Sequence, residues 1–152
     1  MKRNTHIVPL SKDHHHGLLF CWKIRQGLKK HVETGRIAAY VQYFWDGHLV
    51  QHFQEEEELL FTLEGDALCM RAQAEHKLIK AQVEHVVNGT VHADVLTNIA
   101  DLVDDHIRFE ERVLFPHLEQ TLTETQLQAI GQKLEQLHQH QEPDNFADQF
   151  WA

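Results

Sequence analysis

The amino-acid sequence predicts an all-α protein, an up-down-up-down four-helix bundle with an additional C-terminal helix. Three observations predict this class. Apolar residues recur three and four positions apart over four long segments, which is the spacing of one face of an α-helix. Only 3 prolines and 7 glycines occur in 152 residues, so little interrupts long helices. Only short stretches of turn-forming residues lie between the segments. Long helices joined by short turns pack side by side in such a bundle.

Capping and breaking residues bound the first two helices. We expect the first helix over residues 11–31, because Ser11 is a good N-cap. Thr34 and Gly35 are expected to break it. The second helix is expected over residues 37–63, just before Gly65.

The third and fourth helices have equally clear limits. Asp66 can cap a helix that runs to about Val87, with Asn88–Gly89 as its stop. A fourth helix is expected over 90–115, capped by Thr90 and ended by Pro116, since proline removes a helical hydrogen bond.

A fifth helix is predicted at the C-terminal side. Two capping-box patterns, Thr121 with Glu124 and Thr123 with Gln126, open a segment that runs to about Gln139. Its apolar residues, three and four apart, would lie against the bundle. They are Leu127, Ile130, Leu134 and Leu137.

The composition fits a single domain over residues 1–152, with a bundle core at about 10–140 and a tail at 141–152 that ends in aromatic residues. The net charge of −9 argues against a nucleic-acid partner, because nothing concentrates positive charge. No apolar run reaches 18 residues, so we expect no membrane span. The N-terminus lacks the apolar stretch of a signal peptide, and we therefore expect a cytoplasmic location. Cys21 and Cys69 form no CxxC motif and are expected to be core side chains.

Histidine is the outlier of the composition, with 14 residues, as many as lysine and arginine together. His52 and His106 are each followed four residues later by a glutamate, Glu56 and Glu110, and residues four apart share one helix face. Each pair falls within the apolar stripe of its helix. A buried ionised glutamate is costly unless it is paired or binds a metal. Imidazole with carboxylate suits first-row metals, so the pattern predicts a dinuclear metal site.

Single histidines on the other helices complete the candidate site. His76 lies in the middle of the apolar stripe of the third helix. On the first helix His14 is nearest the middle of the stripe and His15 is the next candidate, and helical phase leaves both open. His48 lies one turn before His52 and is a further ligand, a partner behind the ligands, or a gate above the site.

Several glutamates flank these candidates. Glu55 is a further ligand candidate, although Glu56 has the better spacing from His52. We expect the flanking glutamates to be solvated or to lie behind the ligands; they are Glu55, Glu57, Glu58 and Glu111. The metal-free alternative is that buried glutamates and histidines pair as ions, and the convergence of His76 with a histidine of the first helix favours a metal over it.

The chain resembles the hemerythrin-like (HHE) cation-binding domains. The matching stretches are LSKDHHHGLL, HLVQHFQEEEELLF, AEHKLI and DDHIRFEERVLFP, and the likeness covers roughly residues 10–140. The resemblance implies a four-helix bundle with a non-haem di-iron centre, bridged by carboxylates and an oxo or hydroxo group. The ligands that it implies are His14 or His15, His52, Glu56, His76, His106 and Glu110.

One position departs from the family pattern. Hemerythrins that carry oxygen usually have a second histidine four residues after the first on the third helix, and here that position is Lys80. The centre would then have another open position, be completed by His48, or serve iron or nitric oxide chemistry.

These observations predict a binding protein that holds two iron ions, with manganese or zinc as alternative metals, and that binds O2 or NO or senses iron. The first alternative is an enzyme that turns over peroxide or NO, or delivers iron to damaged iron–sulfur clusters, with Lys80 and His48 as candidates for proton delivery. The second is a helical scaffold with an incidental zinc or no metal. We expect neither nucleic acid nor membrane as a partner, and the sequence names no protein partner.

Overall fold

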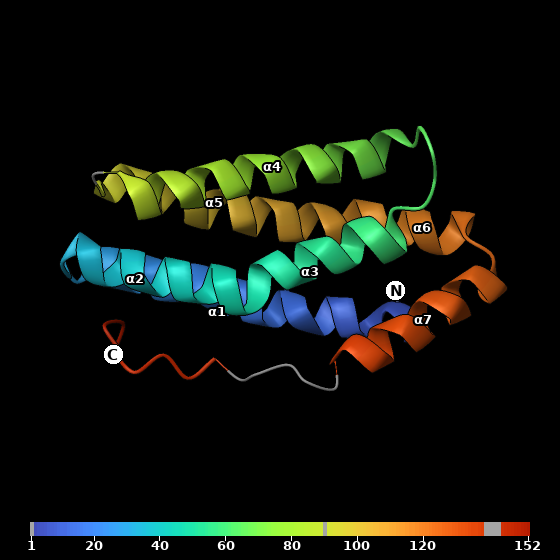
Figure 1. Cartoon of the computed structure of the whole chain (residues 1–152), viewed down its shortest axis with the longest axis horizontal. Coiled ribbons are helices and arrows are strands. Elements are labelled where there is room, and N and C mark those ends of the chain that lie inside the picture. The colour runs from blue at the N-terminus through green and yellow to red at the C-terminus, as the bar shows by residue number, and fades with distance from the viewer. Residues whose placement is uncertain (1, 90, 139–143) are drawn as a thin grey trace.

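The computed structural model describes residues 2–89, 91–138 and 144–152, and every regular element in them is helical. Four long helical stretches lie side by side, and a fifth helix lies across one end (Figure 1). The first stretch is α1 (Val8–Lys29), preceded by a 3₁₀ turn, η1 (Thr5–Ile7). The third stretch is α4 (Ala67–Asn88), and the fifth helix is α7 (Glu124–His138).

The second and fourth stretches each contain π-helical turns. The second runs without a break through α2 (Thr34–Phe44), the π turn η2 (Trp45–Leu49), α3 (Val50–Glu55) and the π turn η3 (Glu56–Leu60). The fourth runs through α5 (Ala93–Phe109), the π turn η4 (Glu110–Leu114) and α6 (Phe115–Thr121). Turns of this kind occur frequently at functional sites.

The expected start of the first helix and the expected break after it are both displaced. The helix begins at Val8 rather than near Ser11, because Pro9 falls in the first turn, where its missing N–H costs nothing. The chain turns at His31, whose φ of 56° is left-handed. Thr34 therefore starts α2 instead of breaking a helix.

The prediction that Pro116 ends the fourth helix is wrong. The backbone N–H of Phe115 bonds to the carbonyl of Glu110, five residues earlier, so the proline enters the first turn of α6 without breaking the stretch. The expected cap Thr90 and the expected helix end Gln139 lie outside the described residues.

The fifth helix and the end of the second also differ in detail. Thr123 and Gln126 exchange the two hydrogen bonds of a capping box, with lengths of 2.9 and 3.1 Å, as predicted. Thr121 instead is the last residue of α6. The second stretch ends at Leu60 rather than Leu63, because the backbone leaves the helical region at Phe61, whose ψ is 59°.

Apolar side chains form two core clusters, and polar groups separate them. On α1, Phe20 belongs to one cluster and Leu10 to the other, with buried His14 between them. On the fourth stretch, Val103 and Leu114 belong to the two clusters in the same way. α1 packs most extensively against α5, which also packs on α4. The packing therefore holds a polar layer at mid-height of the stretches.

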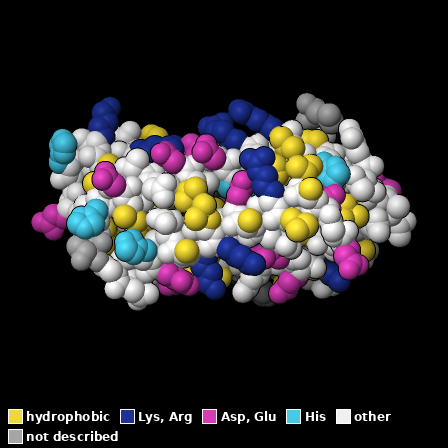
Figure 2. Space-filling model, turned by 90° about the horizontal axis from the view of Figure 1, so that it is seen from above, with side chains coloured by type: hydrophobic (Ala, Val, Ile, Leu, Met, Phe, Trp, Pro, Cys, Tyr) yellow, Lys and Arg dark blue, Asp and Glu magenta, His cyan; other side chains and the backbone are white. Residues whose placement is uncertain are grey.

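Charged and apolar side chains are mixed on the surface of the described residues. The long face in Figure 2 shows acidic and basic side chains interspersed with separate hydrophobic ones. Exposed apolar side chains of α4 include Met70 and Leu78, and single exposed apolar residues are normal. None of the described helices has the length and apolar character needed to cross a membrane.

The C-terminal segment 144–152 docks on the bundle. It runs back along the molecule to the end of α1 and the start of α2 (Figure 1). The Phe150 ring is 3% exposed and lies 5.7 Å from the Tyr40 ring, centroid to centroid. Gly27 makes room for it, because a Cβ there would lie 2.8 Å from the Phe150 ring. Asp144 pairs with Lys23 at 3.2 Å.

Phe150→Ala is expected to lower the free energy of unfolding by about 3 kcal/mol, the usual cost of removing a buried phenylalanine ring. Urea denaturation of the metal-free protein measures this change. The exposed Leu137→Ala variant is the control and should change stability by less than about 0.5 kcal/mol. Equal, small effects of the two substitutions would show that the segment contributes nothing to stability.

Candidate metal centre

Six buried side chains converge in the polar layer between the two apolar clusters. Each of the four long stretches contributes a histidine, and the second and fourth also contribute a glutamate. The exposed fraction is at most 4% for every member. The members are His14, His52, Glu56, His76, His106 and Glu110.

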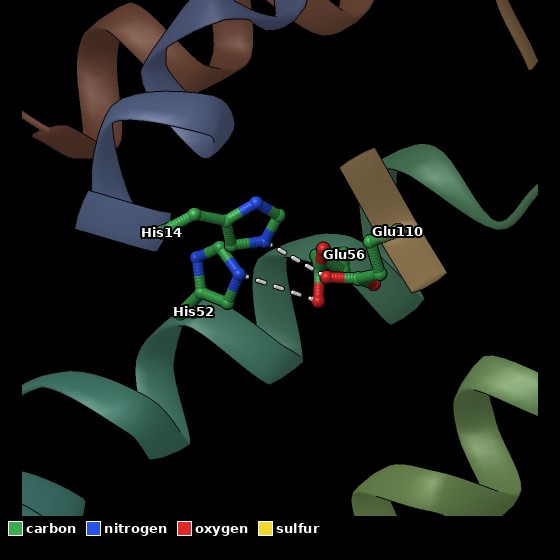
Figure 3. A group of neighbouring side chains, drawn as sticks. All are labelled: His14, His52, Glu56 and Glu110. Carbon is green, nitrogen blue, oxygen red and sulfur yellow. Dashed lines mark hydrogen bonds and ion pairs between the residues drawn. The ribbon is translucent and has the colours of Figure 1, made fainter. Parts of the chain in front are cut away.

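These residues form two groups of four that share both glutamates. One group contains His14 and His52, and Figure 3 shows their rings directed at Glu110 and Glu56. The other contains His76 and His106 with the same two carboxylates. Within each group the nitrogen and oxygen atoms lie within 4.8 Å of one another. Each of these groups could hold a metal ion, and the two groups have both carboxylates in common.

The shared role of the glutamates is visible in single oxygen atoms. Glu56 Oε1 lies 3.4 Å from His52 Nε2 in one group and 3.1 Å from His76 Nε2 in the other. Glu110 Oε1 lies 2.9 Å from His14 Nε2 and 3.4 Å from His106 Nε2. Each carboxylate therefore faces one histidine of each group.

A π turn begins at each of these two carboxylates. Glu56 is the first residue of η3 and Glu110 is the first residue of η4. Each follows its histidine by four residues, so the pair shares one helix face before the wider turn begins. The two turns are thus at equivalent places on the second and fourth stretches.

Some donor atoms of the centre are buried without a hydrogen bond, as expected for atoms that bind a metal. Glu56 Oε2 and Glu110 Oε2 are buried without a hydrogen-bond partner among the described residues, and Glu56 Oε1 and His52 Nε2 have only the ion-pair contacts given above. Buried polar atoms of this kind are rare in folded proteins unless an ion or water completes them. Imidazole nitrogen and carboxylate oxygen are suitable ligands for first-row metals.

Without a metal, these groups pair with one another and hold protons. Burial acts to lower the pKa of His106, but the charge of Glu110 and the hydrogen bonds with Glu110 and Glu75 together outweigh it and raise the pKa to about 10. The pKa values of the other three histidines are also raised against the opposing effect of burial; they are His14, His52 and His76. Burial acts to raise the pKa of Glu110, yet His106 and His14 hold it well below the usual range. A metal would have to displace these protons.

The second ring nitrogen of each histidine faces a carboxylate outside the centre. His52 Nδ1 lies 3.0 Å from Asp13 Oδ2, and His106 Nδ1 lies 2.7 Å from Glu75 Oε1. His76 Nδ1 and His14 Nδ1 each lie 3.3 Å from a carboxylate oxygen, those of Glu57 and Glu111 respectively. We call these four residues the outer carboxylates.

The sequence analysis missed two of the outer carboxylates, Asp13 and Glu75. Glu57 and Glu111 were expected to be solvated or behind the ligands, and the structure places them behind His76 and His14. A signal was present in the sequence, because each outer carboxylate is the immediate neighbour of a residue of the centre.

Two candidates do not reach the centre. His15 is exposed, with its ring 5.8 Å from that of His16, because one helical residue rotates it by 100° from His14. Lys80 is 61% exposed, lies 4.0 Å from Glu84 and belongs to neither group of four donors. Both are corrections to the candidate set.

The other two candidates lie near the centre and outside both groups of four. Glu55 is buried and accepts a hydrogen bond of 2.9 Å from Gln51. His48 lies in η2 with its ring parallel to that of His52, at a centroid distance of 6.5 Å. Burial lowers the pKa of His48 to about 4, so its ring is neutral at pH 7.

A small cavity lies against one side of the centre. Its volume is about 10 Å³, enough for one water-sized molecule. Three histidines of the centre line it together with His48 and Asp13, and apolar residues complete the wall. The histidines are His14, His52 and His106, and the apolar lining includes Gly17, Leu49, Phe53, Val103 and Ile107.

Aromatic rings cover other sides of the centre. Phe53 stacks on His76 with 3.9 Å between ring centroids, and Phe115 stacks on His14 at 5.3 Å.

The arrangement is a cation-binding centre of histidine and glutamate in a helical protein. The hemerythrin HHE cation binding domain matches residues 9–118, and the chain belongs to this family. Comparisons with curated proteins and with solved structures give no match.

Proposed function

We propose that this protein holds two iron ions and binds O2, NO or a related small ligand, or senses iron, through them. The observation that carries the proposal is that two groups of four donors share Glu56 and Glu110. A single metal ion would not need two such groups. Ion pairs among these residues leave Glu56 Oε2 and Glu110 Oε2 buried without a hydrogen-bond partner among the described residues, which is rare in folded proteins.

The geometry suggests a symmetric assignment of ligands. His14 and His52 would hold one ion, and His76 and His106 the other. Glu56 and Glu110 would bridge the two ions. Lys80 faces solvent, so the third stretch offers one histidine to the centre, and each ion receives two.

We further propose that the fold is an up-down-up-down four-helix bundle with α7 as an additional helix. Short connections at residues 30–33 and 61–66 support this, because they return the chain beside the preceding stretch. Such a bundle brings one ligand-bearing face of each stretch to a common interior.

Iron is favoured by the donor set. The centre offers nitrogen and oxygen atoms, and both cysteines are free and buried among apolar residues. Structural zinc sites usually have four closed ligands, often cysteine, whereas shared carboxylates suit a redox-active pair. Manganese and zinc stay as alternatives. When bound, the iron pair would supply electron exchange and a coordination position for a small ligand.

The cavity supports a small ligand rather than a large substrate. It is about 10 Å³ in volume, and its apolar wall includes Leu49, Val103 and Ile107. The residues that line the cavity would exclude bulk water and admit only a molecule of diatomic size. The neutral ring of His48 would present a polar group to that molecule without adding charge.

The experiment is metal analysis with visible spectroscopy of protein purified with iron, recorded after dithionite and again after air or NO. Two irons per chain and a band that changes reversibly are expected. No iron, or one tightly bound zinc, would favour the scaffold interpretation and refute the proposal. Continuous consumption of the ligand would identify an enzyme instead of a binding protein.

A further inference from the structure

The four outer carboxylates form a closed ring around the bundle. Asp13 on α1 contacts His52 on the second stretch, and Glu57 on the second stretch contacts His76 on α4. Glu75 on α4 then contacts His106 on the fourth stretch. Glu111 on the fourth stretch contacts His14 on α1, which closes the ring. Each helical stretch thus provides one carboxylate that contacts the histidine of the next stretch.

The ring has a simple basis in the sequence. Asp13 precedes His14 and Glu75 precedes His76, while Glu57 follows Glu56 and Glu111 follows Glu110. Adjacent residues on a helix point about 100° apart. When one residue of such a pair faces the centre, its neighbour faces the adjoining helix, where the next histidine lies.

The three hydrogen-bonded contacts each select one form of the imidazole ring, whereas Glu111 lies 3.3 Å from His14 Nδ1 as an ion pair without hydrogen-bond geometry. A carboxylate at Nδ1 favours the tautomer that carries its proton there, and this leaves the Nε2 lone pair directed at the centre. It also fixes the orientation of the ring and raises its basicity as a ligand. The Nε2 atoms of all four histidines do face Glu56 or Glu110.

The contacts differ in quality. Asp13 is 5% exposed and Glu75 makes the shortest contact, 2.7 Å, supported by an ion pair of 3.0 Å with Arg71. Glu111 is held by Ser11, whose hydroxyl donates a hydrogen bond of 2.8 Å. The Glu57 side chain is 37% exposed and its contact is 3.3 Å long. Solvent screening weakens an exposed pair, so Asp13 and Glu75 should matter most.

We propose that the outer carboxylates are positioning residues, which orient the four histidines and set the metal affinity of the centre. This inference rests on the proposed function, because it concerns the same metal-binding histidines. Loss of such a partner behind a ligand typically weakens metal binding by about 10–100-fold. The ring also predicts that a defect at one carboxylate affects the histidine of the following stretch and not the neighbouring residue in the sequence.

The test is titration of the metal-free protein with Co²⁺, followed by the visible absorption of the bound ion. Asp13→Ala and Glu75→Ala are each expected to weaken Co²⁺ binding about 10–100-fold and to change the band shape. Asp13→Asn and Glu75→Gln keep an oxygen that can accept from Nδ1, so they should recover part of the affinity. Asp105→Asn is the control, because Asp105 adjoins His106 in sequence but is exposed.

The outcomes separate this inference from the proposed function. Failure of the unsubstituted protein to bind Co²⁺ would overturn both. Normal binding by the unsubstituted protein, with the same affinity and spectrum in the alanine variants, would overturn the positioning role alone. Circular dichroism checks that each variant is folded. Should Asp13→Ala not fold, Glu75→Ala decides the question, because Glu75 is partly exposed and its removal leaves the core intact.

Discussion

Replacing Glu56 or Glu110 by glutamine is expected to remove both metal ions from the protein. Each carboxylate belongs to both groups of donors, so one substitution damages two metal positions at once. Glutamine has nearly the same volume but carries no charge and is a poor bridging ligand. The loss of affinity should exceed about 100-fold at both positions, since loss of a partner behind a ligand already costs about 10–100-fold.

Substitution of a histidine should have a different signature. His14 belongs to one group only and His106 to the other. Alanine at either position is therefore expected to impair one ion more strongly than the other. Protein that holds close to one metal ion per chain should result.

Metal content per chain, measured by mass spectrometry of the purified variants, distinguishes the two patterns. Glu58→Gln and Asp105→Asn are matched controls, because both residues adjoin the site in sequence and are exposed. The controls should retain the full metal content. Retention of one ion by the Glu56 or Glu110 variant would refute the shared role of these carboxylates.

Metal removal is expected to destabilise the protein increasingly as the pH rises above about 6.5. In the metal-free protein the pKa values of the four histidines of the centre are raised by the buried glutamates. A raised histidine pKa contributes stability that is fully present below the unfolded value, about 6.5, and is lost as the pH rises through the folded value. For His106 that folded value is about 10.

At low pH the stability of the metal-free protein changes in the opposite direction. The pKa of Glu110 is lowered in the folded protein, so its contribution is present above the unfolded value of about 4.5 and is lost as the pH falls. The metal-free protein should therefore be most stable between about pH 4.5 and 6.5 as far as these groups decide. Metal binding needs deprotonated histidines and strengthens as the pH rises.

Urea denaturation at pH 6, 7.5 and 9, with metal and after chelation, measures the difference. The gap between the two forms should widen with pH. His15→Gln is the control, because His15 is exposed and should leave both curves unchanged. Metal-free and metal-bound protein with the same stability at all three pH values would contradict both the buried pairing and the metal centre.

Much of the fold could be predicted from apolar spacing and capping residues. Asp66 caps α4 through hydrogen bonds of 3.0 Å to the backbone of Leu68 and Cys69, as its place before an apolar segment indicates. The fate of Pro116 could not be predicted, because it depends on a π turn just before it. Helical phase assumes 100° per residue throughout, so it fails after each π turn. Val113 is in phase with His106 at 100° per residue, yet it lies in the π turn η4 and is 44% exposed.

By itself the sequence determined which residues could form the centre. A histidine and a glutamate four residues apart in an apolar stripe must share a buried face, and this follows from helix geometry alone. The choice between His14 and His15 required the tertiary structure, because helical phase puts His14 nearest the middle of the stripe without excluding His15, and only packing against α5 sets the rotation of α1. The sharing of Glu56 and Glu110 and the ring of outer carboxylates also depended on the tertiary structure. Both features join residues on different helices. The packing of the core sets the distance between helices, and spacing along the sequence does not predict that distance.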